Sequence, residues 1–359
     1  MKEMGLFPYY LSKMYGLDAR VLCYENGPYP FLEKELKGLK IEFLDKKNKK
    51  TIFKTQTSIL KYLFRFSKEI DIFCVKTMTR ENLIYLFLYK ILNPSGKSYL
   101  KLDSDMGIVN NSLLKYRFNR FVFRKIFDSI NLFSIETRKI HESLLEKFPC
   151  IFKNKLEYIP NTIYVNNETI EKLIEKEKII LTLGSIGLAQ KASEILLEAF
   201  LRINRPDWTL VFAGPIFNQF DLYVEEKRKQ YPQLAGNIFL TGKLDDRAKI
   251  NELYDKATVF CLPSRWESFG IVWIEAASRK CYLVASDLPS AQDITDNWRY
   301  GYKVQPGNIE SLVQALSFVT NDGNYKNIQE KGQLLSEYFK ETYSPEIVMG
   351  RLYEWILRS

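Results

Sequence analysis

Short apolar runs alternate with longer amphipathic segments along most of the chain. In the first half, apolar runs rich in strand-forming residues predict strands at Ala19–Tyr24, Lys40–Leu44, Ile70–Val75 and Ser98–Leu102. Asn82–Leu92 predicts a helix that the Asn-Pro-Ser-Gly sequence after it ends. This alternation is typical of βαβ units, so we expect an α/β fold built on parallel, doubly wound sheets.

A second alternating series begins after residue 178. Its predicted strands are Ile179–Leu183, Thr209–Ala213, Ile238–Leu240, Val259–Leu262 and Tyr282–Ala285. The stretch Tyr158–Ile163 indicates the crossing between the two series, and a chain of 359 residues suits two cores better than one. We therefore predict two Rossmann-like domains, residues 1–160 and 161–340, and a terminal helix within 341–359.

The loop after Val259–Leu262 carries the most informative chemistry. Glu267 and Glu275 stand eight positions apart, separated by a Ser-Phe-Gly turn and the start of a predicted helix, Ile271–Ser278. A strand, a loop and a helix in this order expose free amides at the helix N-terminus, which suits an anion such as phosphate. Gly270 would let the main chain approach that anion closely.

This Glu-x7-Glu spacing resembles the signature of the group 1, or family 4, glycosyltransferases, which are retaining enzymes with two Rossmann-like domains (the GT-B fold). The resemblance implies that Glu267 faces the transferred sugar and that Glu275 binds the ribose of a nucleotide diphosphate sugar. It also implies that backbone amides hold the diphosphate, namely those of Ser268, Phe269, Gly270 and Ile271. In this family the donor binds to the C-terminal domain, the acceptor binds to the N-terminal domain, and the terminal helix packs on the latter. Two solvated glutamates around an ordinary loop are the alternative explanation.

A second loop, residues 184–191, resembles the element with which the family binds the donor diphosphate. Gly184 and Lys191 match the family pattern of Gly-Arg followed by Lys, but Ser185 stands at the arginine position. The ammonium of Lys191 would still neutralise a diphosphate, whereas the bidentate guanidinium contact is lost. Arg265 either compensates from the other loop or is a solvated loop charge. Gly214 resembles the turn at the nucleotide edge, although an ordinary turn after a strand explains it equally well.

Asp103 is the catalytic candidate of the first half. The resemblance places a residue that faces donor sugar and acceptor at this strand end, where Asp103 would orient the acceptor hydroxyl or accept its proton. A capping or turn role is the alternative. Asp103 and Asp105 also form an Asp-x-Asp, a metal motif of the other main glycosyltransferase fold. Because Lys191 and helix N-termini already supply positive potential, we expect no metal and no cofactor beyond the nucleotide diphosphate sugar as co-substrate. His141, the only histidine, is expected at a solvated helix position.

The first residues do not match a complete Rossmann half. Residues 1–13 predict the loop and helix that should follow an opening strand, and no such strand comes before them. A truncated chain, a mis-assigned start or a differently built half would each explain this pattern. Because the first strand is central in the doubly wound order, we expect a domain that lacks it to be less stable.

Composition and charge narrow the function further. No run of about 18 apolar residues and no signal peptide are visible. Five scattered cysteines indicate reduced thiols in a cytoplasmic protein rather than a disulfide framework or a zinc site. Residues 1–160 contain 29 Lys and Arg against 17 Asp and Glu, within a net charge of +9 for the chain. The basic and aromatic segment 111–132, with the lysines between 46 and 50, predicts one of two things: a helix with a solvated basic rim, or docking on the anionic inner face of the plasma membrane. No nucleic-acid-binding module is recognisable, so we expect no nucleic-acid partner.

Together these features predict a metal-independent glycosyltransferase. It would move a sugar from a nucleotide diphosphate sugar to a saccharide or lipid-linked saccharide with retention of configuration. The resemblance suggests a cell-surface polysaccharide pathway. Two alternatives stay open. One is a degenerate, non-catalytic nucleotide-sugar-binding protein of the same fold, which Ser185 and the missing strand favour. The other is a different two-Rossmann enzyme such as an epimerase, against which Lys191 and the two glutamates argue.

Overall fold

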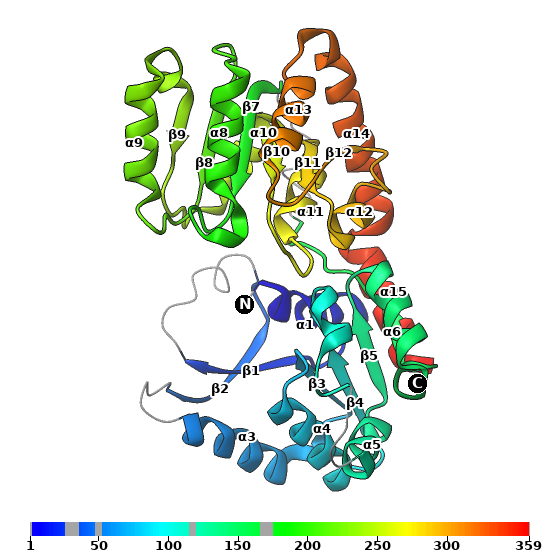
Figure 1. Cartoon of the computed structure of the whole chain (residues 1–359). Coiled ribbons are helices and arrows are strands. Elements are labelled where there is room, and N and C mark those ends of the chain that lie inside the picture. Colours follow the sequence, from blue (N-terminus) through cyan, green and yellow to red (C-terminus); the bar gives the residue numbers. More distant parts are fainter. Residues whose placement is uncertain (1, 26–35, 47–51, 115–119, 166–174, 359) are drawn as a thin grey trace. The chain divides into compact units, whose positions relative to one another are not determined.

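The chain forms two compact units in a computed structural model (Figure 1). The structure describes residues 2–25, 36–46, 52–114, 120–165 and 175–358. The first unit consists of residues 1–164 together with 345–359, and the second consists of residues 165–344. Each unit contains parallel β-strands connected by helices, which confirms the predicted α/β class.

The first unit contains two separate parallel sheets. β1 (Arg20–Glu25) pairs with β2 (Lys40–Lys46), and a second sheet has the order β3 (Ile72–Lys76), β4 (Lys97–Lys101), β5 (Leu132–Ile135) and β6 (Leu156–Tyr158). The helices are α1 (Lys2–Tyr15), α3 (Ile52–Phe66), α4 (Arg80–Leu92), α5 (Arg120–Ser129), α6 (Arg138–Lys147), α7 (Pro149–Phe152) and α15 (Pro345–Arg358). In this part of the described chain the first element is a helix, and no strand comes before β1. Within the described ranges the two sheets share no hydrogen-bonded strand pair, so β1 and β3 are both edge strands there.

Local sequence explains where α4 begins and ends. The side chain of Thr79 accepts a hydrogen bond from the amide of Asn82, which is the usual role of a residue just before a helix. The helix ends at Leu92, two residues before Pro94, because proline cannot continue the backbone hydrogen-bond ladder.

Both faces of the four-stranded sheet are covered. On one face, Leu100 and Phe133 belong to a core shared with the helices that connect the strands. On the other, Tyr99 and Leu132 pack with residues of α1 and α15. The terminal helix α15 is therefore a structural part of the first unit, and Lys97 in β4 donates to the carbonyl of Ile356, with an N–O distance of 2.6 Å.

The second unit is a six-stranded parallel sheet in the order β12-β11-β10-β7-β8-β9. The strands are β7 (Glu177–Leu183), β8 (Thr209–Ala213), β9 (Ile238–Leu240), β10 (Ala257–Leu262), β11 (Tyr282–Ser286) and β12 (Gly301–Val304). The helices are α8 (Ser193–Ile203), α9 (Phe220–Gln230), α10 (Arg247–Lys256), α11 (Ile271–Ser278), α12 (Pro289–Ile294), α13 (Ile309–Val319) and α14 (Tyr325–Thr342). The edge strand β12 was not predicted, since its short Gly-Tyr-Lys-Val sequence lacks an apolar run.

The order of the strands fixes where a ligand can bind in this unit. From β7 the chain proceeds to β8 and β9 on one side, and β10, β11 and β12 lie on the other. The direction therefore reverses between β7 and β10, and open α/β sheets bind ligands beyond the carboxyl ends of the strands at such a switch point. The loops that follow β7 and β10 are the two that the sequence singled out.

We expect Leu352→Ala in α15 to lower the free energy of unfolding of the first unit by about 2–5 kcal/mol, because Leu352 is 1% exposed in its core. Leu357→Ala on the same helix is the control. Leu357 is 63% exposed, so its substitution should change stability by less than about 0.5 kcal/mol. Urea unfolding measures both, and equal effects of the two substitutions would contradict the packing of α15.

Candidate functional site

The loops after β7 and β8 touch through their backbones. A Cβ atom at Gly214 would lie 2.0 Å from the carbonyl oxygen of Gly184, and the φ angle of Gly214 is +132°. Gly184 also donates to Ala213, with an N–O distance of 3.0 Å. Gly184 and Gly214 therefore lie where the ends of two strands approach each other closely. At position 214 only a residue without a side chain permits this approach.

Lys191 and Glu267 meet at the switch point. Their side chains form an ion pair, although the residues are 76 positions apart and follow different strands. The hydroxyl of Ser264 also donates to Oε1 of Glu267, at 2.8 Å. The side chains are only 16% and 9% exposed, so both charges are largely removed from water. Because a buried charge needs a partner, each of the two stabilises the other in the absence of a ligand.

The side chain of Lys191 lies over the glycine loop. Its Cε atom is 3.5 Å from the position that a Cβ of Gly184 would occupy. The residue belongs to a short 3-10 turn, Ala189–Lys191, directly before α8. Because Gly184 has no side chain, the aliphatic part of Lys191 can extend across it towards the loop after β10.

The amides that follow Glu267 lie at the N-terminus of α11. Gly270 precedes the helix with φ +72°, and no side chain caps the helix there. In the described part of the chain, the amides of Ser268 and Ile271 donate to no protein acceptor. Phe269 is 1% exposed and its ring lies 6.1 Å from that of Tyr343, so its side chain belongs to the core. The predicted amides therefore present donors and partial positive charge to an anion.

Glu275 is buried and contacts both Arg247 and Tyr254. Arg247 lies 2.8 Å from its Oε1 atom, and the hydroxyl of Tyr254 donates to Oε2 at 3.0 Å. Burial, with the Glu275 carboxylate as the next contribution, raises the pKa of Tyr254 well above its usual value. Sequence reasoning missed Arg247 and Tyr254. They share a face of α10 seven positions apart, and no local pattern distinguishes this pair from the other residues of the helix.

Arg265 contacts the end of the loop 184–191 and the start of α8, and not the side chain of Ser185. Its guanidinium lies 2.7 Å from Glu194 in α8 and also donates to the carbonyl of Ala189. Ser185 itself is half-buried, and its carbonyl accepts from Leu188. In this arrangement Arg265 fastens the loop after β10 to the start of α8.

Asp103 lies in the first unit at the carboxyl end of β4. Its carboxylate is 2.8 Å from the ammonium of Lys76, which ends β3. Asp103 has φ +42° and Thr77 has φ +70°, a conformation that residues other than glycine rarely adopt. Strained backbone of this kind costs about 1–3 kcal/mol and clusters at functional sites.

A buried ion pair lies close to Asp103. Lys101 and Glu136 are 2.5 Å apart and are 4% and 0% exposed, at the carboxyl ends of β4 and β5. The pKa of Glu136 is raised above its usual value, mainly by burial. Lys101 opposes this shift, and the negative charge of Asp103 adds to it. Sequence reasoning missed Lys76, Lys101 and Glu136, because their importance depends on strand neighbours that the sequence does not state.

The remaining polar candidates have structural contacts. Asp105 accepts from the amide of Gly107 at 2.8 Å and begins a short 3-10 turn. Among the described residues, no group of three or more His, Cys, Asp and Glu side chains is arranged to hold a metal. His141 is half-buried in α6, with its Nε2 atom 3.4 Å from the carbonyl of Leu156.

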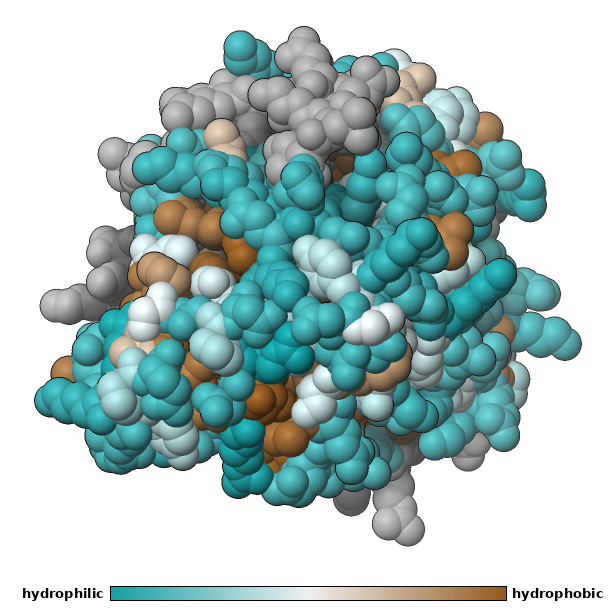
Figure 2. Space-filling model, turned by 90° about the horizontal axis from the view of Figure 1, so that it is seen from above, coloured by the Kyte–Doolittle hydropathy of each residue, from teal (hydrophilic) through white to brown (hydrophobic). Residues whose placement is uncertain are grey.

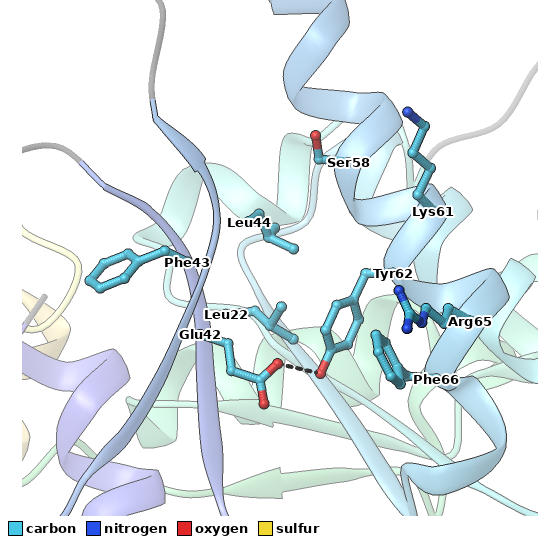
Figure 3. Close-up of a pocket in the computed structure, with 9 residues that line it drawn as sticks. All are labelled: Leu22, Glu42, Phe43, Leu44, Ser58, Lys61, Tyr62, Arg65 and Phe66. Atoms are coloured by element: carbon cyan, nitrogen blue, oxygen red, sulfur yellow. Dashed lines mark hydrogen bonds between the residues drawn. The ribbon is translucent and has the colours of Figure 1, made fainter.

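The first unit also contains a pocket of about 370 Å³ between its two-stranded sheet and α3 (Figure 3). Apolar residues of β1 and β2 meet the basic side chains of Lys61 and Arg65 there. The hydroxyl of Tyr62 donates to Glu42 at 2.9 Å. None of the residues predicted for the site lines this pocket.

The surface in Figure 2 is mainly hydrophilic, with hydrophobic residues in separate patches. No helix in the described ranges is both long enough and apolar enough to cross a bilayer.

Comparison with known proteins finds similarity to glycosyltransferases. Residues 166–334 match the family model of the glycosyl transferases group 1. An uncharacterized glycosyltransferase of Haemophilus influenzae is 23% identical over 94% of this chain and 96% of its own length. A phosphatidyl-myo-inositol mannosyltransferase of Mycolicibacterium smegmatis is 26% identical over 55% of this chain and 51% of its own. This second likeness thus covers about half of either protein.

Solved structures show the fold. HepE of Anabaena, in complex with UDP and glucose, has a TM-score of 0.73 at 15% identity, over 99% of this chain and 96% of that chain. A glycosyltransferase of Rickettsia africae has the same TM-score at 19% identity, over 98% and 92%. The two units therefore form a GT-B fold, as predicted.

We expect Gly214→Ala to destabilise the second unit by about 1–3 kcal/mol, since the new side chain meets the Gly184 backbone at a strained φ angle. Gly236→Ala serves as the control, because its Cβ would have no neighbour within 4 Å. Thermal unfolding compares the two. If Gly214→Ala were as stable as the control, the contact between the two loops would not exist in solution.

Proposed function

We propose that this chain, in which residues 166–334 match the glycosyl transferases group 1, is a glycosyltransferase that uses a nucleotide diphosphate sugar and retains the configuration of the sugar. The observation that carries the proposal is the convergence of Lys191 and Glu267 at the switch point, beside the free amides before α11. A cation, a carboxylate and helix amides are the groups that a departing diphosphate and a cationic sugar require.

Different residues of the second unit would bind different parts of the donor. The ammonium of Lys191 and the amides of Ser268, Gly270 and Ile271 would hold the diphosphate, as the burial of Lys191 strengthens its field. Glu267 would face the transferred sugar and stabilise positive charge at its anomeric carbon. Glu275 would accept hydrogen bonds from the ribose. The negative diphosphate competes with Glu267 for Lys191, so donor binding would release that carboxylate towards the sugar.

The reaction proposed here needs no metal and no cofactor besides the donor. Lys191 and the helix N-terminus supply the positive charge that a divalent cation provides in other glycosyltransferases. Asp103, held by Lys76 in strained backbone, would orient the acceptor hydroxyl or accept its proton.

The acceptor would be a saccharide or a lipid-linked saccharide in cell-surface polysaccharide synthesis, and the enzyme would act in the cytoplasm. One relative is named as a mannosyltransferase that acts on phosphatidyl-myo-inositol, a lipid. The first unit is basic, and the exposed Arg124 and Lys125 lie on α5. These features suggest docking on the anionic inner face of the plasma membrane. The predicted basic residues at 117 and 47–50 lie outside the described residues.

Lys191→Ala should lower the rate of sugar transfer about 10²–10³-fold, because it removes one electrostatic contact to the leaving diphosphate. Transfer and donor hydrolysis can both be followed by mass spectrometry of the products with a panel of nucleotide sugars. Lys227→Ala is a matched control, since Lys227 forms an ion pair with Glu198 at similar exposure on α9. An unchanged rate in Lys191→Ala would remove Lys191 from the site, and binding without turnover in the native protein would refute the enzymatic function.

Charge reversal at Arg124 and Lys125 should weaken binding to vesicles that contain anionic lipid, by about 1 kcal/mol for each basic residue lost. Co-sedimentation with anionic and neutral vesicles measures this. Arg358→Glu on α15 serves as the control for net charge. Equal sedimentation of all variants would show that α5 does not dock on membranes.

A further inference from the structure

Arg247 has an environment that the family resemblance did not anticipate. It is the first residue of α10, and its side chain is 20% exposed, whereas the side chain of its partner Glu275 is 4% exposed. Arg247 is therefore the member of the pair that lies nearer to solvent. Asp246, which caps α10 through the amide of Ala248, holds the start of this helix in place.

The two donors on Glu275 fix the direction of its remaining lone pairs. Arg247 occupies one site on Oε1, and Tyr254 occupies one site on Oε2. An ionised carboxylate has about four acceptor sites, so it can accept hydrogen bonds from more than two donors. Tyr254 is fully buried and its ring packs 5.6 Å from that of Phe260, which restricts the position of its hydroxyl.

Without Arg247 the carboxylate would be a poorly compensated buried charge. Such a group turns towards water, and it then accepts ligand hydrogen bonds less well. A guanidinium suits this task because it stays charged and holds a fixed, planar geometry.

We infer that Arg247 is a positioning residue, which keeps the carboxylate of Glu275 aimed at the ribose hydroxyls of the donor nucleotide. The inference rests on the proposed function, in which Glu275 binds the ribose. Arg247 acts through Glu275 and makes no hydrogen bond of its own to the ribose. Its removal should therefore weaken only that part of nucleotide binding which depends on the ribose hydroxyls.

The test compares UDP with 2′,3′-dideoxy-UDP by isothermal titration calorimetry. We expect Arg247→Met to weaken UDP binding about tenfold or more, and to leave the affinity for dideoxy-UDP within about twofold of the native value. Arg247→Lys should restore part of the UDP affinity. Tyr254→Phe removes the other donor without a change of charge, so it should show the same selective loss and also serves if Arg247→Met does not fold.

Arg279→Met is a matched control. Arg279 pairs with Asp255 at 3.0 Å and joins the far ends of the same two helices, α10 and α11. It should lower stability without a selective effect on UDP.

Two results would overturn the inference while the proposed function stands. One is an unchanged UDP affinity in Arg247→Met and Tyr254→Phe. The other is an equal loss for UDP and dideoxy-UDP, which would assign Arg247 a direct electrostatic role. If the native protein bound neither UDP nor any other nucleoside diphosphate, the proposed function and the inference would both be wrong.

Discussion

The ion pair between Lys191 and Glu267 is the interaction on which the candidate site depends. It joins the loops after β7 and β10, which come from opposite halves of the sheet in the second unit. A charge this poorly exposed is stable only while it has a partner, so each residue holds the other's loop in place. The same constraint makes the ion pair sensitive to anionic ligands, because such a ligand offers Lys191 a second partner. Structure and proposed reactivity thus follow from one electrostatic requirement.

The first unit repeats this principle at the carboxyl ends of its strands. Lys76 pairs with Asp103, and Lys101 pairs with Glu136, on three neighbouring parallel strands. Asp103 takes part in one pair while its backbone adopts a strained conformation. A strained backbone conformation is stable only when the surrounding contacts hold the residue in place. The packing of α1 and α15 beneath these strands provides such surroundings.

The division of the first unit into two sheets has a cost. β1 and β3 each leave one row of backbone groups outside any described strand pairing. Helix α15 packs on the four-stranded sheet of this unit although it is far away in sequence. Exposed strand edges are also places where another extended segment can pair.

The amino-acid sequence alone predicts the α/β class, a two-domain plan and the two loops that meet at the switch point. The period of the apolar residues predicts helices and strands because it follows which side chains are buried. The loops that carry Gly184, Lys191, Glu267 and Glu275 come together because loops after parallel strands lie at the same edge of the sheet. Only the folded structure shows which charged side chains form ion pairs with each other. Arg265 binds Glu194, whereas Arg247, which no motif marks, supports Glu275. Pairing depends on distances of a few ångströms between residues far apart in the chain, and a linear pattern contains no such distances.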